Sequence, residues 1–428
     1  MKILLLNVHS ALNLGDEAIM AVTVSSLQQA FPQVHITIAA NDPQSWQDYT
    51  SPTVSILPSL SNWVADARLG QWRQSLIKTP FYLFWLTGVV ILWRLLAWRW
   101  PFGRPEQGQL LEAYYQADLV LSCGGGNFYA HHSPSPAFFW NLMTLALARG
   151  LGKPVLMLPQ SFGPVRGRGQ QLLARLVLNR VNLIMCREAI SVQFLQKTLR
   201  LRTPMRLLPD LAFGLGQSST NADKPQGMDE QSVNRPGARM RLGLSVLNRG
   251  AQNREFQGQN QYEEALVTVL THFAQVEQAE IHLFVQCYGP SSDQDDRLMT
   301  KRLAERLRPH CPALFVWEHF RDAQTLKTAY RQMDGVIATR MHTAIFALSN
   351  ETPVLIIGYQ PKSQGMITAF HLEAYCRPIE AVTAAWLQER LTTLLAERET
   401  IGTQIQHHLI TLQAQNSYWL REVKDNIK

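Results

Sequence analysis

Apolar residues along the first half of the chain recur in two alternating patterns. Short apolar runs bounded by turn residues predict buried strands, and longer segments with apolar positions three or four apart predict helices. Strands are predicted at 3–8, 34–39, 117–122, 154–158 and 183–186, and helices at 18–30, 138–149, 169–181 and 190–199. Strands separated by helices of this length are typical of a parallel, doubly wound sheet.

The same alternation resumes after a polar interruption at 216–238, where almost no large apolar residue occurs. This composition predicts a linker or loop between two domains. Beyond it, strands are predicted at 241–246, 281–285, 314–317, 335–338 and 353–357, with helices at 262–276, 293–307, 323–332 and 343–348. The sequence therefore predicts an α/β protein with two Rossmann-like domains that face each other across a cleft. Their predicted bounds are 1–215, with a Trp-rich insertion at about 60–105, and 239–378, followed by a helical segment at 379–428.

Length and charge narrow the class of partner. At 428 residues the chain exceeds what one hydrophobic core usually serves, which also favours two domains. A net charge of +7 favours anionic partners such as phosphates, acidic sugars or anionic lipid headgroups. No stripe of Lys and Arg interleaved with aromatic residues is present, so we expect no nucleic-acid partner. Five scattered cysteines without CxxC spacing are typical of reduced thiols in a cytosolic protein.

Residues 80–100 of the insertion are apolar and aromatic except for Arg94 and Arg99. The uncharged stretch 80–93 is shorter than the ~20 residues that a membrane-spanning helix needs. Clustered Trp beside Arg suits a helix lying at a membrane interface. A buried helix or a subunit contact would have the same composition, and the sequence leaves these alternatives open.

Arg340-Met341-His342 is the strongest candidate for chemistry. It stands where the apolar run 336–338 gives way to a helical pattern, at the carboxyl end of a predicted strand. Open α/β sheets bind anionic ligands at such positions. Arg can hold a carboxylate or phosphate by two parallel hydrogen bonds, and His can transfer a proton near neutral pH. The motif therefore indicates chemistry on a small anion.

Other cations also follow predicted strands. Arg249 and Lys362 do so in the second domain, and Arg187 does so in the first. Repetition of this device predicts an electropositive sheet edge suited to a phosphorylated donor. For Arg187, an ion pair with Glu188 at a helix start is an equally good explanation.

Polar and Gly-rich segments follow strands of the first domain and are candidates for binding sugar hydroxyls. They supply Asn13 and Asp16, Gly125 and Asn127, and Gln160. Simple helix capping would explain Asn13 and Asp16, and a tight turn would explain the glycines. The sequence contains no P-loop, metal-binding cluster or nucleophile elbow, so we expect group transfer without a metal or cofactor.

Taken in order, these motifs resemble the polysaccharide pyruvyl transferase family. The matching pieces are Asn13-Leu14-Gly15-Asp16-Glu17, Gly124-Gly125-Gly126-Asn127-Phe128, Pro159-Gln160-Ser161-Phe162-Gly163-Pro164, Arg187-Glu188, Pro209-Asp210, Asp334 with Arg340-Met341-His342-Thr343, and Lys362. The resemblance implies a GT-B-like fold and transfer of pyruvyl from phosphoenolpyruvate to hydroxyls of a cell-surface or exopolysaccharide sugar, as a ketal. It also implies that Arg340 and His342 belong to the donor site and that Asp334 orients their segment.

Our hypothesis is that His342 is the general acid or base and that Arg340 binds the donor phosphate or carboxylate. Lys362, Arg249 and Arg187 would be further donor contacts. Asn13, Asp16, Gly125, Asn127 and Gln160 would hold the acceptor. We expect a cytoplasmic protein, with peripheral attachment to the membrane through 80–100 and a lipid-linked acceptor left open. The alternatives are a glycosyltransferase that uses a nucleotide sugar and a non-catalytic glycan-binding protein at the membrane.

Overall fold

A computed structural model describes residues 1–64, 72–99, 104–216, 239–253 and 255–427. Internal packing divides the chain into two compact units. Unit 1 comprises Met1–Ala11, Ile19–Leu211 and Gln415–Lys428, and unit 2 comprises Leu12–Ala18 and Ala212–Ala414. Apart from Gly216, the predicted linker at 216–238 lies outside the described residues.

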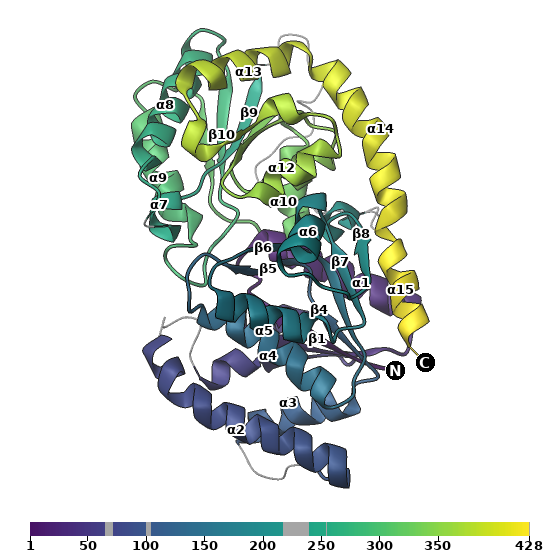
Figure 1. The fold of residues 1–428 in the computed structure, drawn as a ribbon. Helices are drawn as coiled ribbons and strands as arrows, with labels where there is room; N and C mark the ends of the chain where they lie inside the picture. The colour runs from purple at the N-terminus through teal and green to yellow at the C-terminus, as the bar shows by residue number, and fades with distance from the viewer. Residues whose placement is uncertain (65–71, 100–103, 217–238, 254, 428) are drawn as a thin grey trace. The chain divides into compact units, whose positions relative to one another are not determined.

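Unit 1 is built on a parallel sheet in the order β3-β2-β1-β4-β6-β7-β8, with β5 paired to β6 (Figure 1). Its strands are β1 (Lys2–Val8), β2 (His35–Ala40), β3 (Val54–Pro58), β4 (Leu119–Ser122), β5 (Gly125–Ala130), β6 (Val155–Val165), β7 (Leu183–Cys186) and β8 (Met205–Leu207). Its helices are α1 (Leu14–Ala30, whose first residues belong to unit 2), α2 (Trp72–Leu96), α3 (Pro105–Gln116), α4 (Pro136–Gly150), α5 (Arg168–Leu178), α6 (Ala189–Gln193) and α15 (Tyr418–Asn426).

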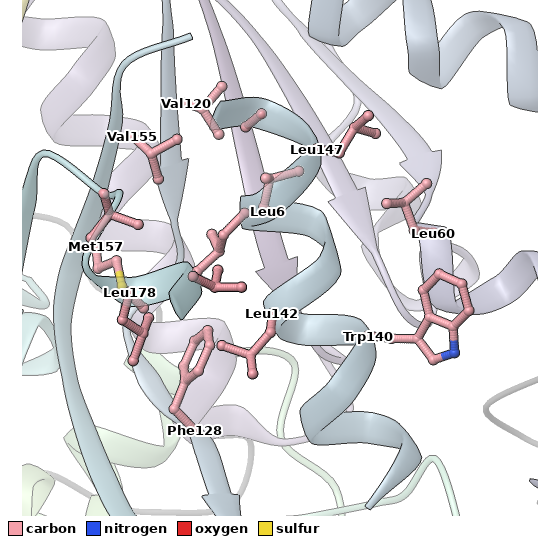
Figure 2. Packing of buried hydrophobic residues seen from close by; sticks show 14 of the residues in the cluster. Leu6, Leu60, Val120, Phe128, Trp140, Leu142, Leu147, Val155, Met157 and Leu178 are labelled. Carbon is pink, nitrogen blue, oxygen red and sulfur yellow. The ribbon is translucent and has the colours of Figure 1, made fainter. Parts of the chain in front are cut away.

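The core of unit 1 forms because its central strands are continuously apolar, as strands covered on both faces must be. Leu6, Val120 and Met157 from three of these strands belong to one cluster of buried side chains that also contains Leu142 of α4 (Figure 2). The same cluster takes in residues of α3 and α5. Its members are removed from water almost completely, and each large side chain buried in this way contributes about 1.5–3 kcal/mol.

Unit 2 is built on a second parallel sheet, in the order β11-β10-β9-β12-β13-β14. Its strands are β9 (Arg241–Ser245), β10 (Glu280–Phe284), β11 (Leu314–Trp317), β12 (Gly335–Ala338), β13 (Val354–Gly358) and β14 (Cys376–Pro378). Its helices are α7 (Arg249–Gln252), α8 (Gln259–Gln275), α9 (Asp296–Leu307), α10 (Ala323–Tyr330), α11 (Met341–Leu348), α12 (Pro361–Thr368), α13 (Ala384–Ala396) and α14 (Arg398–Asn416), the last ending beyond the unit boundary.

The predicted α/β class with two Rossmann-like sheets is confirmed. The glycine run, for which a tight turn was the alternative to ligand binding, leads into strand β5 at Gly125–Ala130, which lies beside β6 and was not predicted. Gly125 begins this strand with a φ of 119°, a conformation that L residues with side chains rarely adopt. The unit bounds also differ from the predicted domain bounds. Leu12–Ala18 groups with unit 2, and Gln415–Lys428 groups with unit 1.

A buried imidazole in the sheet of unit 2 gives stability a pH dependence. His282 of β10 stacks on Phe315, with ring centroids 4.8 Å apart, and its Nδ1 accepts a hydrogen bond from Trp317 Nε1 at 3.1 Å. Burial lowers the pKa of His282 to about 4, although nearby Glu280 opposes this change. The folded state therefore holds a neutral imidazole at neutral pH.

We expect the stability of unit 2 to fall as pH is lowered from about 6.5 toward 4. In this window the unfolded chain, with an ordinary histidine pKa near 6.5, binds more protons than the folded chain. The loss contributed by His282 is about 2 kcal/mol at pH 5. Urea unfolding at pH 7 and pH 5 measures it, with His282→Gln as the comparison because glutamine can accept from Trp317 without titrating. An equal pH dependence in both proteins would contradict the assignment.

Candidate active site

The segment Arg340-Met341-His342 lies where β12 ends and α11 begins. β12 is flanked by β9 and β13, so its carboxyl end is at the middle of the sheet edge. The backbone N–H of Thr339 donates to the carbonyl of Ser245 at 3.4 Å, which continues the ladder to the helix start. Arg340 occupies the N-cap position, and His342 is the second residue of α11. The predicted strand-to-helix transition is therefore present.

Arg340 is buried and paired with a carboxylate. Its Nε donates to Asp296 Oδ2 at 3.2 Å, its Nη2 forms a second bond to Asp296 Oδ1, and Nη2 also donates to the carbonyl of Gln294 at 3.1 Å. Burial, the largest single effect, acts to lower the pKa of Arg340, but the charge and hydrogen bonds of Asp296, together with Cys287 and Tyr359, raise that pKa above its ordinary value overall. Among the described residues no hydrogen bond uses Nη1, so this nitrogen is the one available to a ligand.

His342 packs against the glycine of the Asn13-Leu14-Gly15-Asp16-Glu17 segment, and both belong to unit 2. A Cβ on Gly15 would lie 2.0 Å from Nδ1 of His342, so only glycine fits beneath the imidazole. Leu14 N–H donates to the carbonyl of Gln286 at 3.1 Å, and Glu17 Oε2 accepts from Ala323 N–H at 2.8 Å. This segment therefore fixes the loop after β10 and the start of α10 beside His342.

Asn13 and Asp16 are largely satisfied within the same turn. Asn13 Oδ1 accepts from Gly15 N–H at 3.1 Å, and Asn13 Nδ2 donates to Asp16 Oδ2 at 3.1 Å. These bonds are those of a capped helix start. Local geometry thus favours capping over acceptor binding for this pair.

Arg249 and Lys362 meet at one aromatic ring. Arg249 Cζ lies 5.2 Å and Lys362 Nζ 5.9 Å from the centroid of Tyr359, which directly follows β13. Arg249 is 7% exposed, and its Nε has no hydrogen-bond partner among the described residues. Cations from the ends of β9 and β13 therefore flank the Arg340 segment at the end of β12, as their places in the sequence predicted.

Arg187 has a different environment, in unit 1. Its Nε donates to Ser161 Oγ at 2.7 Å, its Nη1 pairs with Asp210, and Glu188 Oε2 lies 3.6 Å from Nε. The side chain is 1% exposed. Two carboxylates thus surround one buried guanidinium, which favours the predicted ion-pair alternative over a donor contact.

The remaining acceptor candidates lie around a buried amide network in unit 1. Asn127 Nδ2 donates to the carbonyl of Asn7 at 2.8 Å, and Asn7 Nδ2 donates to Ser122 Oγ at 3.1 Å. Asn7 has a φ of 59°, an uncommon conformation that is concentrated at functional sites. Gln160 is fully buried beside Gly125, and its amide has no hydrogen-bond partner among the described residues.

Several residues of these sites were not predicted. Asp296, Tyr359 and Asn7 carry no local motif: each is defined by a partner distant in sequence, such as Arg340 for Asp296. Asp334, expected to orient the Arg340 segment, acts at the other end of β12, where Oδ2 accepts from Arg241 N–H at 2.8 Å. In the described part of the chain no group of three or more His, Cys, Asp or Glu could hold a metal ion.

A sequence model of the polysaccharide pyruvyl transferase family matches residues 13–361, which begin at the Gly15 segment and end at the start of α12. The chain belongs to this family. It is also 24% identical over 412 residues to the amylovoran biosynthesis protein AmsJ of Erwinia amylovora, covering 95% of this chain and 94% of AmsJ. Family membership makes the chain a transferase of polysaccharide biosynthesis with a saccharide acceptor.

Solved structures with a similar fold include GT-B glycosyltransferases and epimerases. A glycosyltransferase from Rickettsia africae ESF-5 superposes with a TM-score of 0.60 at 11% identity, covering all of this chain and 98% of that chain. The UDP-GlcNAc 2-epimerase from Neisseria meningitidis also gives 0.60 at 11% identity, covering 99% of this chain and 100% of the epimerase. At such identities the likeness shows the fold alone, and it confirms the GT-B-like expectation for this member of the family.

Substitution of Gly15 by Ala tests the contact with His342. The new methyl group would overlap the imidazole, so the ring must move, and overpacking of this kind costs about 1–3 kcal/mol. We expect urea unfolding of unit 2 to show a loss in this range. Gly169→Ala on α5 is the control, since a Cβ there meets nothing within 4 Å. Equal stability of Gly15→Ala and wild type would contradict the packing.

Proposed function

We propose that this enzyme transfers pyruvyl from phosphoenolpyruvate to two hydroxyls of a saccharide, forming a ketal and releasing phosphate, with the donor bound at the sheet edge of unit 2. The observation that carries the proposal is the gathering of Arg249, Arg340, His342 and Lys362 at the carboxyl ends of three neighbouring strands. Family membership supplies the class of reaction, and these side chains supply the means to bind the donor.

The charges at this edge suit a donor with both a carboxylate and a phosphate. Asp296 neutralises much of the charge of Arg340. The proposed role of Asp296 is to hold the guanidinium in place, with Nη1 of Arg340 toward the ligand. Arg249 and Lys362 bring two further cationic side chains to this edge. Because Arg249 is buried with an unpartnered Nε, an anion bonded to it would gain a charge-assisted hydrogen bond in a largely dry site.

The proposed reaction begins with proton transfer to the methylene carbon of phosphoenolpyruvate, which leaves the neighbouring carbon electrophilic. One sugar hydroxyl attacks that carbon and loses its proton. A second hydroxyl then attacks the same carbon and loses its proton, the bond between that carbon and the phosphate oxygen breaks, and phosphate leaves with the bonding electron pair as the ketal ring closes. His342 is the proposed general acid or base, and Arg340 stabilises the charge on the donor.

For the acceptor, we propose Asn127 and Gly125 of unit 1 as the leading contacts. Asn127 is only half-buried, and its carbonyl and amide join it to the network around the uncommon backbone of Asn7. Gln160 is fully buried, so a role for it requires a water molecule or a movement of its neighbours. Asn13 and Asp16 are weaker candidates because their polar atoms already bond to each other.

We further propose that the enzyme works on the cytoplasmic side of the membrane. Phosphoenolpyruvate is a metabolite of the cytoplasm, so a transferase that uses it must meet it there. Whether the saccharide is lipid-linked during transfer is decided by testing free and lipid-linked acceptors side by side.

Binding of phosphoenolpyruvate should raise the melting temperature of the wild-type protein. At a ligand concentration 100 times Kd the folded state gains about 2.7 kcal/mol, which is several degrees for a domain of this size. Arg249→Gln and Lys362→Gln should each remove most of this shift, whereas Lys301→Gln, an exposed position on α9, should retain it. A shift produced by UDP or GDP and not by phosphoenolpyruvate would indicate a nucleotide-sugar transferase instead.

Loss of the His342 imidazole should lower turnover far more than donor binding. We expect kcat of His342→Gln to fall by about 10²–10⁴, the usual contribution of a general acid or base, with the phosphoenolpyruvate melting shift retained. The assay is phosphate release together with mass spectrometry of the saccharide product for a pyruvyl increment. Near-normal phosphate release by this variant would show that another group transfers the proton.

A further inference from the structure

Helix α2 carries one apolar face that the rest of unit 1 leaves uncovered. Phe84 and Leu95 are 83% and 76% exposed, and Phe81 and Ile91 are exposed on the same side of the helix. The four positions are spaced by three, seven and four residues, which places them in one stripe along the helix. We call this stripe, Phe81, Phe84, Ile91 and Leu95, the α2 face.

The opposite side of α2 is fixed to the core. Leu86 and Val89 are buried in the cluster of unit 1, and Trp93 stacks on Tyr115 with centroids 4.6 Å apart. Trp93 Nε1 also donates to the carbonyl of Leu151 at 3.2 Å. Lys78–Leu96 is long and apolar enough to span a membrane, with a mean hydropathy of 1.5. Its packing, however, makes it a surface helix of unit 1, because a span would have to abandon these contacts.

Exposed apolar area of this extent marks a binding surface in a soluble domain. Each large side chain left in water forgoes about 1.5–3 kcal/mol of burial energy. Unit 1 leaves the four large apolar side chains of the α2 face exposed to water. Leu96, the last residue of α2, and Trp98 just after it are exposed as well. The α2 face is therefore suited to an occupant that is itself apolar.

The charges around α2 identify that occupant. No Asp or Glu occurs between residues 72 and 105, whereas Lys78, Arg94, Arg99 and Arg104 all lie in this range; of these cations, Arg99 is paired with Glu112 at 2.6 Å. Arg94 is held at the last turn by the carbonyl of Gly150, to which its Nε donates at 2.6 Å. Burial and the charge of Arg94 both lower the pKa of Arg149, which indicates cations crowded at this end. A second copy of the chain would bring like charges together, whereas an anionic surface would not.

From this geometry we propose that α2 lies in the headgroup region of an anionic lipid bilayer, with the α2 face inserted and the neighbouring cations on lipid phosphates. Interfacial helices bind by the sum of buried apolar area and attraction to anionic headgroups. The attachment does not depend on the proposed pyruvyl transfer.

Co-sedimentation of the full chain with vesicles tests the proposal. We expect binding to vesicles of phosphatidylcholine with phosphatidylglycerol, weaker binding to phosphatidylcholine alone, and a decrease with salt. Phe84→Ser combined with Leu95→Ser should reduce binding by about tenfold or more, since two inserted apolar side chains are lost. Lys78→Gln should reduce it by about fivefold, the contribution of one cation at an anionic surface.

The matched control is Leu172→Ser with Leu176→Ser on α5. Those leucines are 58% and 51% exposed in the same unit, but they lie on a different helix, and their replacement should leave vesicle binding unchanged. Equal binding by wild type and the α2 double variant would overturn the proposal. So would a concentration-dependent dimer that the α2 variant abolishes without any vesicle binding by wild type. Turnover of a soluble acceptor should be the same in all these variants, so loss of binding and loss of catalysis are told apart.

Discussion

A buried guanidinium must be paired, and the candidate site of this protein is organised by that requirement. Arg340 stands at the centre of the sheet edge of unit 2, and Asp296 is completely buried beside it. Removing one partner of such a pair typically costs 3–5 kcal/mol, because the other charge is left without compensation. The pair therefore joins the loop after β10 to the start of α11. Asp296 Oδ2 also accepts from Cys287 N–H at 3.1 Å, which extends the same restraint to the strand end.

Shape acts together with charge at this point. The imidazole of His342 has room only because residue 15 has no side chain, and the Gly15 segment is in turn bonded to Gln286 and Ala323. Thr343 completes the arrangement by donating to Gln286 Oε1. A side chain held by packing on one side and by a hydrogen-bonded loop on the other, as the His342 imidazole is, loses little entropy when a ligand binds, which is the general advantage of a preorganised site.

Most of the strands and helices could be predicted from the sequence, because the periodicity of apolar residues and the turn residues are local signals. The buried strands at 3–8 and 335–338 were found in this way, and the cations after β9, β12 and β13 followed from them. The sequence did not predict which side chains bond to partners that are distant along the chain. The partner of Arg340 is 44 residues away, and that of Asn7 is Asn127. The strand at 125–130 was also missed, because a strand that begins with glycine in a positive φ has no periodic signature.

The division of the chain has a consequence for how the protein is made. Residues 12–18 are synthesised long before residues 286–288 of unit 2, with which they pair, as in the contact of Asn13 with Cys287. Unit 1 in turn includes residues 415–428, where Glu422 binds Arg206 at 2.9 Å. Domains usually fold in the order of synthesis, but here unit 2 needs residues up to 414, and unit 1 needs residues 415–428, which follow all of unit 2. About 270 residues separate Asn13 from its partner Cys287, so this contact cannot form until that whole length has been synthesised. Contacts between residues so far apart in sequence form slowly. Unit 1 is therefore completed only after all of unit 2 has been synthesised.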